Sequence, residues 1–478
     1  MTDDQIPRRK FVKYAGIAGA GAAMAGCSGG NGGNGGNGGN GGTGGNGNGN
    51  GNGNGGNGNG DGLDSGERPL TWIGPAWAVR DGQAEIYTNV TGIDVDTTNA
   101  TIPTVQQRIL GGERESFDAF SLDTAGAGAL VNDNDAHIPV PTEDLPGWDP
   151  EVTSELFTNP GERLSDLGAQ TETVNEVLWQ DDERTELRFA PHVYNFDAVG
   201  YNPEYVDEST LWSDLFDDQY EGEAIIGSTS SITIPQALMH LVDNGMLDGE
   251  VGDLNNPTEE QLDAAIDFLI EQKTSGQFRS TWEAYGESVN LMASEEAVIG
   301  DLWQPAALDT RRSGTPITYA TMETGQNGYQ GYRYWYGGIS PTNPGASNRN
   351  NYDEVAKLID VHYGAAFPGF IQGYGYSVPH YPNEELVRDG SDDTGDGMGP
   401  EYYDWAYNGE ATYDPIDEPA LFDPLEHDWA DEEGEPSDDG STRDSGPIEE
   451  RIDRIGFFQI WPDNASYMTD RWRDFTSA

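Results

Sequence analysis

Cysteine, lysine and histidine are scarce in this chain of 478 residues. There is one cysteine, Cys27, and there are four lysines and six scattered histidines. A single cysteine excludes a disulfide framework within the chain, and no CxxC or HExxH pattern occurs anywhere in it. We therefore expect neither a transition-metal site nor a cofactor, and we expect the histidines to be structural or to lie at the surface.

Positive charge is also scarce, with 24 Lys and Arg against 84 Asp and Glu and a net charge of −60. Such a charge repels the phosphates of nucleic acids and anionic lipids, which argues against either as the main partner. The 12 Trp, 22 Tyr and 15 Phe indicate a folded body, because disordered acidic chains are poor in aromatic residues. The acids are spread over the whole chain. This favours a solvated surface suited to very high salt, as in halophilic organisms, over a protein that attracts cations.

Long hydrophobic runs are absent, and the apolar segment at residues 14–26 is short. Its thirteen residues would form a helix of about 20 Å, less than the ~30 Å hydrocarbon core of a membrane. Because it follows Arg8 and Arg9, the segment fits a twin-arginine export signal, and the residues before Cys27 resemble a lipobox. We expect lipid attachment at Cys27 with two acyl chains, the alternative being a chance cysteine beside a cleavage site.

Side chains able to build a core are nearly absent from residues 28–66, which are mostly Gly and Asn. Such a segment behaves as a flexible coil, with a root-mean-square reach on the order of 30–35 Å. We expect residues 1–27 to address and anchor the chain. Residues 28–66 would then hold a folded body away from the outer face of the cell membrane.

Predicted strands and helices alternate from residue 67 onwards. Residues 68–74 and 93–98 are typical of strands, with a helix between them that ends at Gly92. A second cycle has a helix with Val105, Ile109 and Leu110 on one face, followed by a strand at 117–122. This alternation predicts an α/β fold with a parallel sheet and ligand groups at the carboxyl ends of its strands, and the length favours two domains or one bilobed unit.

Three later helices have clear signals, and one long segment has few. Residues 257–276 contain an amphipathic repeat with Thr258 as its cap, residues 351–364 contain a second, and residues 465–475 form a closing helix. Residues 384–447 are rich in Asp, Glu, Gly and Pro. We interpret them as a solvated acidic insertion.

Six stretches, in order, resemble the spermidine/putrescine-binding branch of the solute receptors of ABC importers, in a member from a halophilic archaeon. They are LTWIGPAWAV with YTNVTGIDVDTT, FDAFSLDTAGAGAL, FAPHVYNFDAVGYNPEYVDESTLWSDLFDDQYEGEAIIGS, EEAVIGDLWQPAALDTRRSGTPITYA, GYRYWYGGISPTN and FIQGYGYSVPHYPN. The resemblance covers residues 70–383 and the last helix.

The resemblance implies a bilobed type II periplasmic-binding-protein fold, with crossings near Gly200, Tyr336 and Tyr376 and a ligand cleft between the lobes. Such a receptor is not an enzyme. It is a monomer that closes on a small molecule and presents the closed form to the ABC permease and its ATPase. The implied lobes are 67–200 with 338–376, and 201–337 with 377–478.

Ligand pockets in this branch are aromatic boxes with a few acids, which hold a methylene chain and its ammonium ends. The residues that the resemblance places in the pocket, or that alternate with such residues, are Trp77, Asp123, Thr124, Tyr194, Asp301, Trp303, Trp335, Tyr336, Gln372 and Tyr374.

Two expected acids are absent. Position 337, where the family has Asp after the second box tryptophan, is Gly, and the loop at 228–235 (STSSITIP) has no carboxylate. Either Asp123, Asp197 and Asp301 replace them, or the ligand is a small anion such as a phosphonate or carboxylate. Such an anion would be bound by the hydroxyls of the 228–235 loop and the start of the following helix.

Two other classes stay open. A tethered extracellular carbohydrate hydrolase would need only two carboxylates, although no G-x-S-x-G nucleophile motif occurs. A calcium-stabilised surface protein is suggested by DGSDDTGDG at 389–397, whose spacing is not that of an EF-hand loop.

Overall fold

The computed structural model describes residues 69–478 with internal gaps. The predicted export signal with Arg8, Arg9 and Cys27, the predicted tether at 28–66 and most of the acidic segment at 384–447 lie outside the described residues. In the described part of the chain, no helix has the length and apolar character needed to cross a membrane. The gaps are 81, 129, 131–135, 152, 165–170, 250–253, 365–366, 368–370, 373, 380–387, 392–394, 397–398 and 405–446.

The described strands and α-helices alternate through most of the chain. The strands are β1 (Leu70–Gly74), β2 (Val95–Asn99), β3 (Ala119–Asp123), β4 (Val140–Pro141), β5 (Glu186–Leu187), β6 (Ala190–Tyr201), β7 (Ala224–Gly227), β8 (Phe278–Trp282), β9 (Ile299–Leu302), β10 (Thr318–Tyr319), β11 (Tyr332–Pro341), β12 (Gly390–Ser391), β13 (Gly395–Asp396) and β14 (Ile455–Phe458). The α-helices are α2 (Gln83–Thr91), α3 (Ile102–Arg108), α4 (Thr124–Gly128), α5 (Glu155–Thr158), α6 (Pro160–Arg163), α7 (Thr171–Leu178), α8 (Ser230–Asp243), α9 (Glu259–Ser275), α10 (Tyr285–Ala293), α11 (Gln304–Arg312), α12 (Gly345–Arg349), α13 (Tyr352–Asp360), α16 (Pro400–Tyr403), α18 (Ile448–Ile452) and α19 (Ala465–Ser477).

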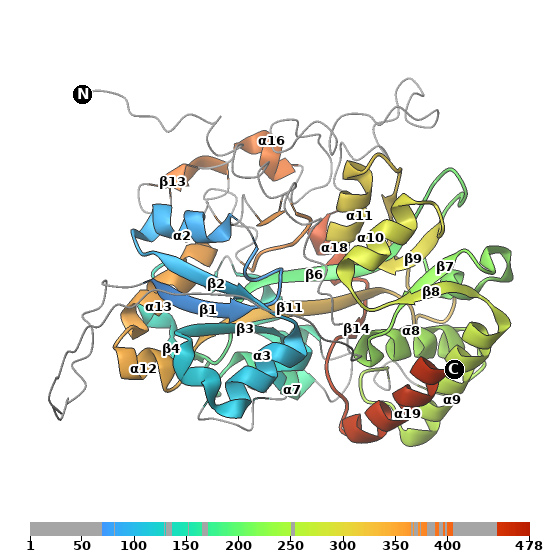
Figure 1. The fold of residues 1–478 in the computed structure, drawn as a ribbon, viewed down its shortest axis with the longest axis horizontal. Helices are drawn as coiled ribbons and strands as arrows, with labels where there is room; N and C mark the ends of the chain where they lie inside the picture. Colours follow the sequence, from blue (N-terminus) through green and yellow to red (C-terminus); the bar gives the residue numbers. More distant parts are fainter. Residues whose placement is uncertain are drawn as a thin grey trace, which may run out of the picture.

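Ten of the described strands form one sheet that has two similar halves. Its order is β2-β1-β3-β11-β6-β9-β7-β8, with β10 paired to β6 and β14 to β11. In the first half β2, β1 and β3 are parallel and β11 is antiparallel to them. In the second half β8, β7 and β9 are parallel and β6 is antiparallel. The expected parallel sheet is therefore correct for the outer strands only, because two long antiparallel strands cross between the halves (Figure 1).

The partner exchange of β6 joins the halves. This strand pairs with β11 as far as Asp197 and with β9 from Ala198 onwards. All twelve of its residues are buried, as are the ten of β11. Strands that are buried along their whole length are covered on both faces, and helices flank both halves of this sheet (Figure 1).

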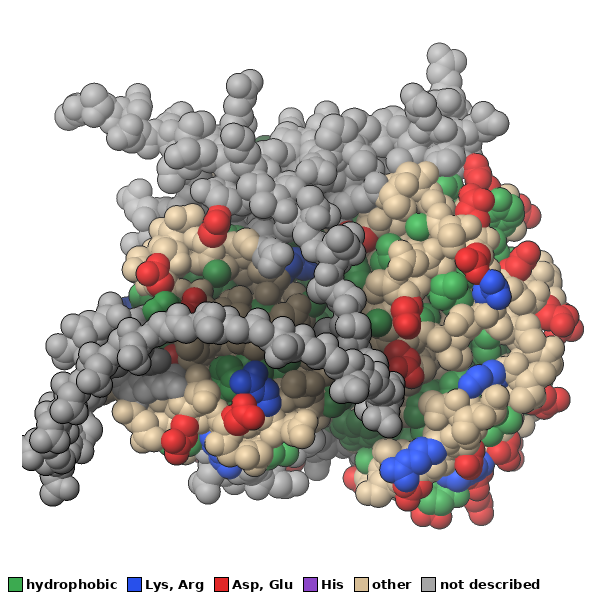
Figure 2. All heavy atoms as spheres, in the orientation of Figure 1, with side chains coloured by type: hydrophobic (Ala, Val, Ile, Leu, Met, Phe, Trp, Pro, Cys, Tyr) green, Lys and Arg blue, Asp and Glu red, His purple; other side chains and the backbone are tan. Residues whose placement is uncertain are grey.

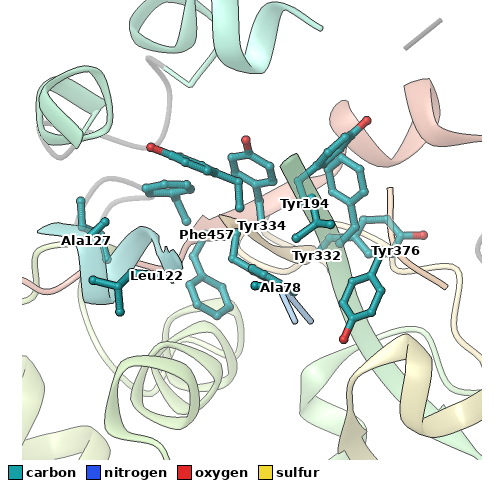
Figure 3. Close-up of a cluster of buried hydrophobic side chains, with 14 of the residues drawn as sticks. Ala78, Leu122, Ala127, Tyr194, Tyr332, Tyr334, Tyr376 and Phe457 are labelled. Carbon is teal, nitrogen blue, oxygen red and sulfur yellow. The ribbon is translucent and has the colours of Figure 1, made fainter. Parts of the chain in front are cut away.

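Aromatic side chains fill one face of the sheet where the halves meet. Tyr332, Tyr334 and Tyr336 share one face of β11, since alternate strand residues point the same way. The ring centroid of Tyr334 lies 5.2 Å from that of Phe458. It lies 6.2 Å from that of Tyr194 of β6, and Figure 3 shows these two tyrosines. This face of the junction is a packed core, the tyrosine core.

Local signals in two helices are confirmed, and those of a third are only partly correct. Gly92 ends α2 with a φ of 73°, and Thr258 and Gln261 form the capping box of α9. Leu110, expected on the buried face of α3, is 47 % exposed. The helix ends at Arg108, and a π-helical turn that contains Gly112 at a φ of 92° follows. The wider turn places Leu110 away from the core.

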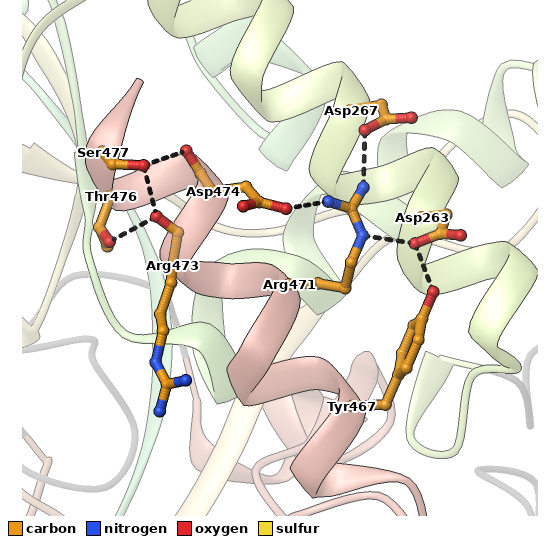
Figure 4. Close-up of polar contacts among 8 residues, drawn as sticks. All are labelled: Asp263, Asp267, Tyr467, Arg471, Arg473, Asp474, Thr476 and Ser477. Atoms are coloured by element: carbon orange, nitrogen blue, oxygen red, sulfur yellow. Dashed lines mark hydrogen bonds and ion pairs between the residues drawn. The ribbon is translucent and has the colours of Figure 1, made fainter.

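The closing helix α19 packs on α9 through a polar cluster at the surface (Figure 4). Arg471 donates to Asp263 at 2.6 Å and to Asp267 at 2.8 Å, and the Tyr467 hydroxyl donates to Asp263 at 2.9 Å. Elsewhere on the face shown in Figure 2, Asp and Glu side chains outnumber Lys and Arg, in keeping with the composition.

Candidate functional site

Trp335 of β11 packs against two aromatic side chains, Trp77 and Tyr376, on the face of the sheet opposite the tyrosine core. Its indole ring is 5.7 Å from that of Trp77, which follows β1, and 6.2 Å from the ring of Tyr376, which it meets edge-on. Trp335 is 6 % exposed and Trp77 is half-buried. Offset and edge-on contacts of this kind hold the rings in fixed orientations.

Gly337 leaves the space that Trp77 fills. A Cβ atom placed on Gly337 would lie 2.2 Å from Cζ3 of Trp77, far inside contact distance. An acid at position 337 could not coexist with this position of the Trp77 ring. The absence of the expected carboxylate and the presence of Trp77 are therefore one structural feature.

A second aromatic group comes from the other half of the sheet. Trp303, which precedes α11, stacks on Tyr285 of α10 at 6.1 Å and meets Trp282 of β8 edge-on at 5.1 Å. Trp303 and Tyr285 are half-buried, so part of each ring is available to a ligand. The Tyr285 hydroxyl donates to Asp309 of α11 at 2.5 Å.

Arg80 lies between the two aromatic groups and was not among the residues predicted from the sequence. Its guanidinium carbon is 4.3 Å from the ring centre of Tyr374 and 5.8 Å from that of Tyr376. Burial alone would lower the pKa of Arg80, but nearby Tyr376, Tyr285 and Asp309 raise it above its ordinary value. Arg80 therefore stays charged. One sequence signal pointed to it, because no other basic residue occurs between positions 69 and 107.

A buried ion pair fixes the orientation of the Trp335 ring through a hydrogen bond. Asp197 of β6 pairs with Arg333 of β11 and accepts a hydrogen bond from Nε1 of Trp335 at 2.9 Å. Nη1 of Arg333 donates to Oε1 of Gln459 at 2.5 Å, and Nε2 of Gln459 donates to Asp123 of β3 at 3.3 Å. Burial lowers the pKa of Arg333 to about 9, with Asp123 opposing the change. The chain of contacts connects strands of both halves.

Two of the predicted polar residues belong to this chain of contacts. Asp123 also accepts a hydrogen bond from the Gly126 N–H at 2.7 Å, and Thr124 donates its hydroxyl to the Gln459 carbonyl at 2.9 Å. Burial raises the pKa of Asp123, while the Gly126 N–H and Arg333 oppose this. The hydroxyl of Thr124 is therefore used within the protein.

Asp301 lies behind Trp282 and Trp303 and not beside Trp335. It is 1 % exposed, and a Cβ atom on Gly227 would lie 3.1 Å from one of its carboxylate oxygens. Burial raises the pKa of Asp301 to about 6, while Gln236 and the Gly227 N–H act in the opposite direction.

Tyr194 and Tyr336 lie on the other face of the sheet. Their rings pack 5.3 Å and 5.7 Å from Phe157, within the tyrosine core. Gln372 is fully buried, and its carbonyl accepts a hydrogen bond from the Gly375 N–H. The predicted residues thus fall into several places. Tyr374 lies under Arg80, and Trp77 packs on Trp335. Asp123 and Thr124 belong to the contacts of Gln459, Asp301 and Trp303 to the second half, and Tyr194, Tyr336 and Gln372 are buried elsewhere.

Two buried amides near Trp335 were also not predicted. Asn195 of β6 is directly opposite Trp335 in the strand pairing, is fully buried, and has no hydrogen-bond partner for either amide atom among the described residues. Gln304 is 1 % exposed, its Oε1 lacks a partner in the same set of residues, and its Cγ lies near Gly375, next to Tyr376. A buried polar group without a partner is unfavourable by about 1–3 kcal/mol, so such groups indicate a place for a polar ligand or water.

The serine- and threonine-rich segment at 228–235 forms the start of α8. Ser231 and Thr233 are buried, and the Thr233 hydroxyl donates to the Gly227 carbonyl at 2.5 Å. Within the described ranges, no group of three or more His, Cys, Asp or Glu side chains is placed to hold a metal ion. In the acidic sequence at 389–397, residues 392–394 and 397 lie outside those ranges.

Comparison with known proteins shows the fold. No family model matches the chain, and no curated protein matches it in sequence. Among solved structures, it is similar to the spermidine/putrescine ABC transporter substrate-binding protein PotD from Streptococcus pneumoniae, at 15% identity and a TM-score of 0.54, over 86% of this chain and 99% of that one. It is also similar to a putative spermidine/putrescine ABC transporter from Listeria monocytogenes, at 14% identity and a TM-score of 0.54, over 85% and 98%. The expected fold class is confirmed: the chain has the mixed α/β fold of periplasmic binding proteins.

Proposed function

We propose that this protein is the substrate-binding receptor of an ABC importer and works by closing on a small solute. The observation that carries the proposal is that each half of the sheet has its own group of packed, partly exposed aromatic side chains, Trp77 with Trp335 in one half and Trp303 with Tyr285 in the other. A ligand that contacts both groups stabilises the closed arrangement and shifts the population towards it.

The hinge is proposed to lie where β6 changes partners, between Asp197 and Ala198. Few backbone torsions need to change at such a point, since the strand is continuous while its neighbours differ. The proposed moving units follow the implied lobes, 67–200 with 338–376 and 201–337 with 377–478, except that we set the boundaries on β6 and β11 at Asp197 and its partner Arg333, so that Trp335 moves with Trp77.

Export and anchoring complete the proposal. The twin-arginine signal at Arg8 and Arg9 and lipid attachment at Cys27 would keep the receptor at the outer face of the membrane, within reach of the permease and ATPase. The tether at 28–66 would allow the monomeric folded part to move between solvent and importer.

A polyamine is the first candidate for the solute. It is suggested by the sequence resemblance and by the names of the two similar structures. Trp303 and Tyr285 offer ring faces, each worth about 0.5–2 kcal/mol to an ammonium group. Asp309 is a half-buried carboxylate beside these rings, since it accepts a hydrogen bond from the Tyr285 hydroxyl at 2.5 Å.

A small organic anion is the second candidate, and the position of Arg80 favours it. The guanidinium covers the ring of Tyr374 and points into the same junction. An arginine at this place offers charge-assisted hydrogen bonds to a carboxylate or phosphonate.

Ligand-dependent melting tests the receptor proposal. A bound solute should raise the free energy of unfolding by RT ln(1 + [L]/Kd), about 2.7 kcal/mol at a hundredfold excess over Kd. Trp303→Ala should remove most of this shift, while Trp148→Ala, a half-buried tryptophan of the first half that packs on Tyr363, should not. Hydrolysis of a glycan panel by the purified protein would contradict the proposal and favour the hydrolase alternative.

A further inference from the structure

We infer that Arg80 binds an anionic group of the solute, so that the site selects a small organic anion, with a carboxylate as the simplest case, over a polyamine. The inference rests on the proposed receptor function and specifies the ligand class of the same site.

The guanidinium of Arg80 lies over two tyrosine rings. Arg80 follows β1 and reaches the ring faces of Tyr374 and Tyr376, at 4.3 Å and 5.8 Å. A protein cation thus already occupies these faces, which a ligand ammonium would otherwise use. A second positive charge brought to the same rings would be repelled, because charges interact strongly where water is excluded.

Arg80 has a hydrogen-bond donor that a ligand could use. Its Nε is buried and has no hydrogen-bond partner among the described residues. A guanidinium has five N–H donors in a planar fork that matches the two oxygens of a carboxylate. A ligand carboxylate that accepts from Nε and an adjacent Nη would satisfy the buried donor and retain the charge of Arg80.

Two buried amide side chains, which carry no charge, lie near these aromatic rings. Asn195 lies opposite Trp335, whose ring contacts Tyr376, and Gln304 lies beside Gly375. Both amides are buried, with Asn195 entirely without partners in the described part of the chain and Gln304 lacking one at Oε1. They offer donors and acceptors to uncharged groups of a ligand, such as a hydroxyl or an amide, and supply no negative charge for an amine.

Three carboxylates in this region already accept hydrogen bonds from groups of the protein. Asp197 already accepts from Arg333 and Trp335, and Asp123 from Gly126 and Gln459. Asp309 accepts from Tyr285 and lies near Arg80. A diammonium ligand is bound most strongly where carboxylates accept charge-assisted hydrogen bonds from its two ends. In this part of the described structure those three carboxylates bind protein donors, whereas Arg80 retains a donor for a ligand.

Isothermal titration calorimetry on the full chain, in the high-salt buffer that its acidic surface suits, tests the inference with succinate, methylphosphonate and putrescine as probes. We expect the wild type to bind one of the two anions and not putrescine. Arg80→Gln should weaken anion binding by about 30- to 100-fold, the loss expected for a charge-assisted bidentate contact. Arg80→Lys should retain part of the affinity, because it keeps the charge without the planar fork.

Arg473→Gln is the matched control, since it removes an exposed arginine of α19 whose ion pair is local. It should leave the Kd unchanged, and circular dichroism checks that each variant is folded. Should Arg80→Gln not fold, the Arg80→Lys comparison decides. Putrescine binding that is equally tight in the wild type and both Arg80 variants would overturn the inference and leave the receptor proposal standing. No binding of any of the three probes would contradict both.

Discussion

The indole ring of Trp77 lies against the α-carbon of Gly337, so closely that one added carbon atom would overlap it. These residues are far apart in sequence and meet because β1 and β11 are both neighbours of β3. The contact explains why a carboxylate is absent from a position where the resembled family has one. It also places a large apolar surface beside Trp335 in its stead.

Gly337→Ala should destabilise the protein by about 1–3 kcal/mol, the usual range for overpacking a filled site, because the new methyl group displaces the Trp77 ring. In the double variant with Trp77→Ala the clash is absent. The two changes should therefore couple by more than about 1 kcal/mol in a double-mutant cycle measured by chemical denaturation. Additive effects would show that the ring and the glycine do not share this space.

Asn195→Leu should stabilise the unliganded protein or leave it unchanged, since it replaces a buried amide without partners by an apolar group of similar shape. The same variant should reduce ligand-dependent stabilisation. Thermal melting with and without the bound solute measures both effects.

Asn351→Leu is the control for that substitution. Asn351 is a buried amide that does have a partner, donating to Asp118 at 3.1 Å. Its replacement should destabilise the protein by about 1–3 kcal/mol, because the buried acceptor on Asp118 loses its donor. Equal losses in the two variants would mean that Asn195 has partners of its own.

The burial of Asp301 leads us to expect that its contribution to the stability of the fold decreases as the pH rises. Its folded-state pKa is raised to about 6 by burial, above the ordinary value of 3.8, so the folded state binds this proton more tightly than the unfolded state. Its contribution to stability is most favourable below about pH 4 and is lost as the pH rises through 6. Asp301→Asn should therefore be more stable than the wild type at pH 8, with the difference shrinking on acidification towards pH 4. A difference that does not change with pH would contradict the burial of an ionised Asp301.

For His240 we expect the opposite dependence of stability on pH. It is stacked 5.1 Å from Phe268, and burial lowers its pKa to about 4 from the ordinary 6.5, with Asp243 opposing the change. The neutral ring is favoured in the folded state, so this contribution is complete above pH 6.5 and is lost as the pH falls towards 4. The full effect is up to about 3 kcal/mol.

His240→Gln should lose less stability than the wild type between pH 6.5 and 4, as measured by urea denaturation at each pH. Subtracting the two curves cancels the carboxylates that titrate in the same range. Parallel curves would show that His240 is not buried as a neutral ring.

The α/β alternation and several helix ends could be predicted because their causes are local. The capping box of Thr258 and Gln261 and the Gly92 terminus each depend on residues within a few positions of one another. Leu110 was predicted wrongly, since the period of an α-helix was extended across a segment where the backbone widens before Gly112. The sequence predicts Trp77, Trp303, Trp335 and Tyr374 as ligand-binding residues but not Tyr285 or Tyr376, and it does not give the face on which each ring lies.

Composition alone determined that this is an acidic, aromatic-rich chain with a net charge of −60, and short-range patterns determined where most helices and strands form. Only the tertiary structure decided which side chains meet. Strand order and register place Asn195 opposite Trp335 and bring Arg80 to Tyr374, while Tyr194 and Tyr336 turn to the other face. A one-residue change of register reverses the face of every side chain in a strand. The composition of the site was therefore set by pairing between distant segments, which no local pattern encodes.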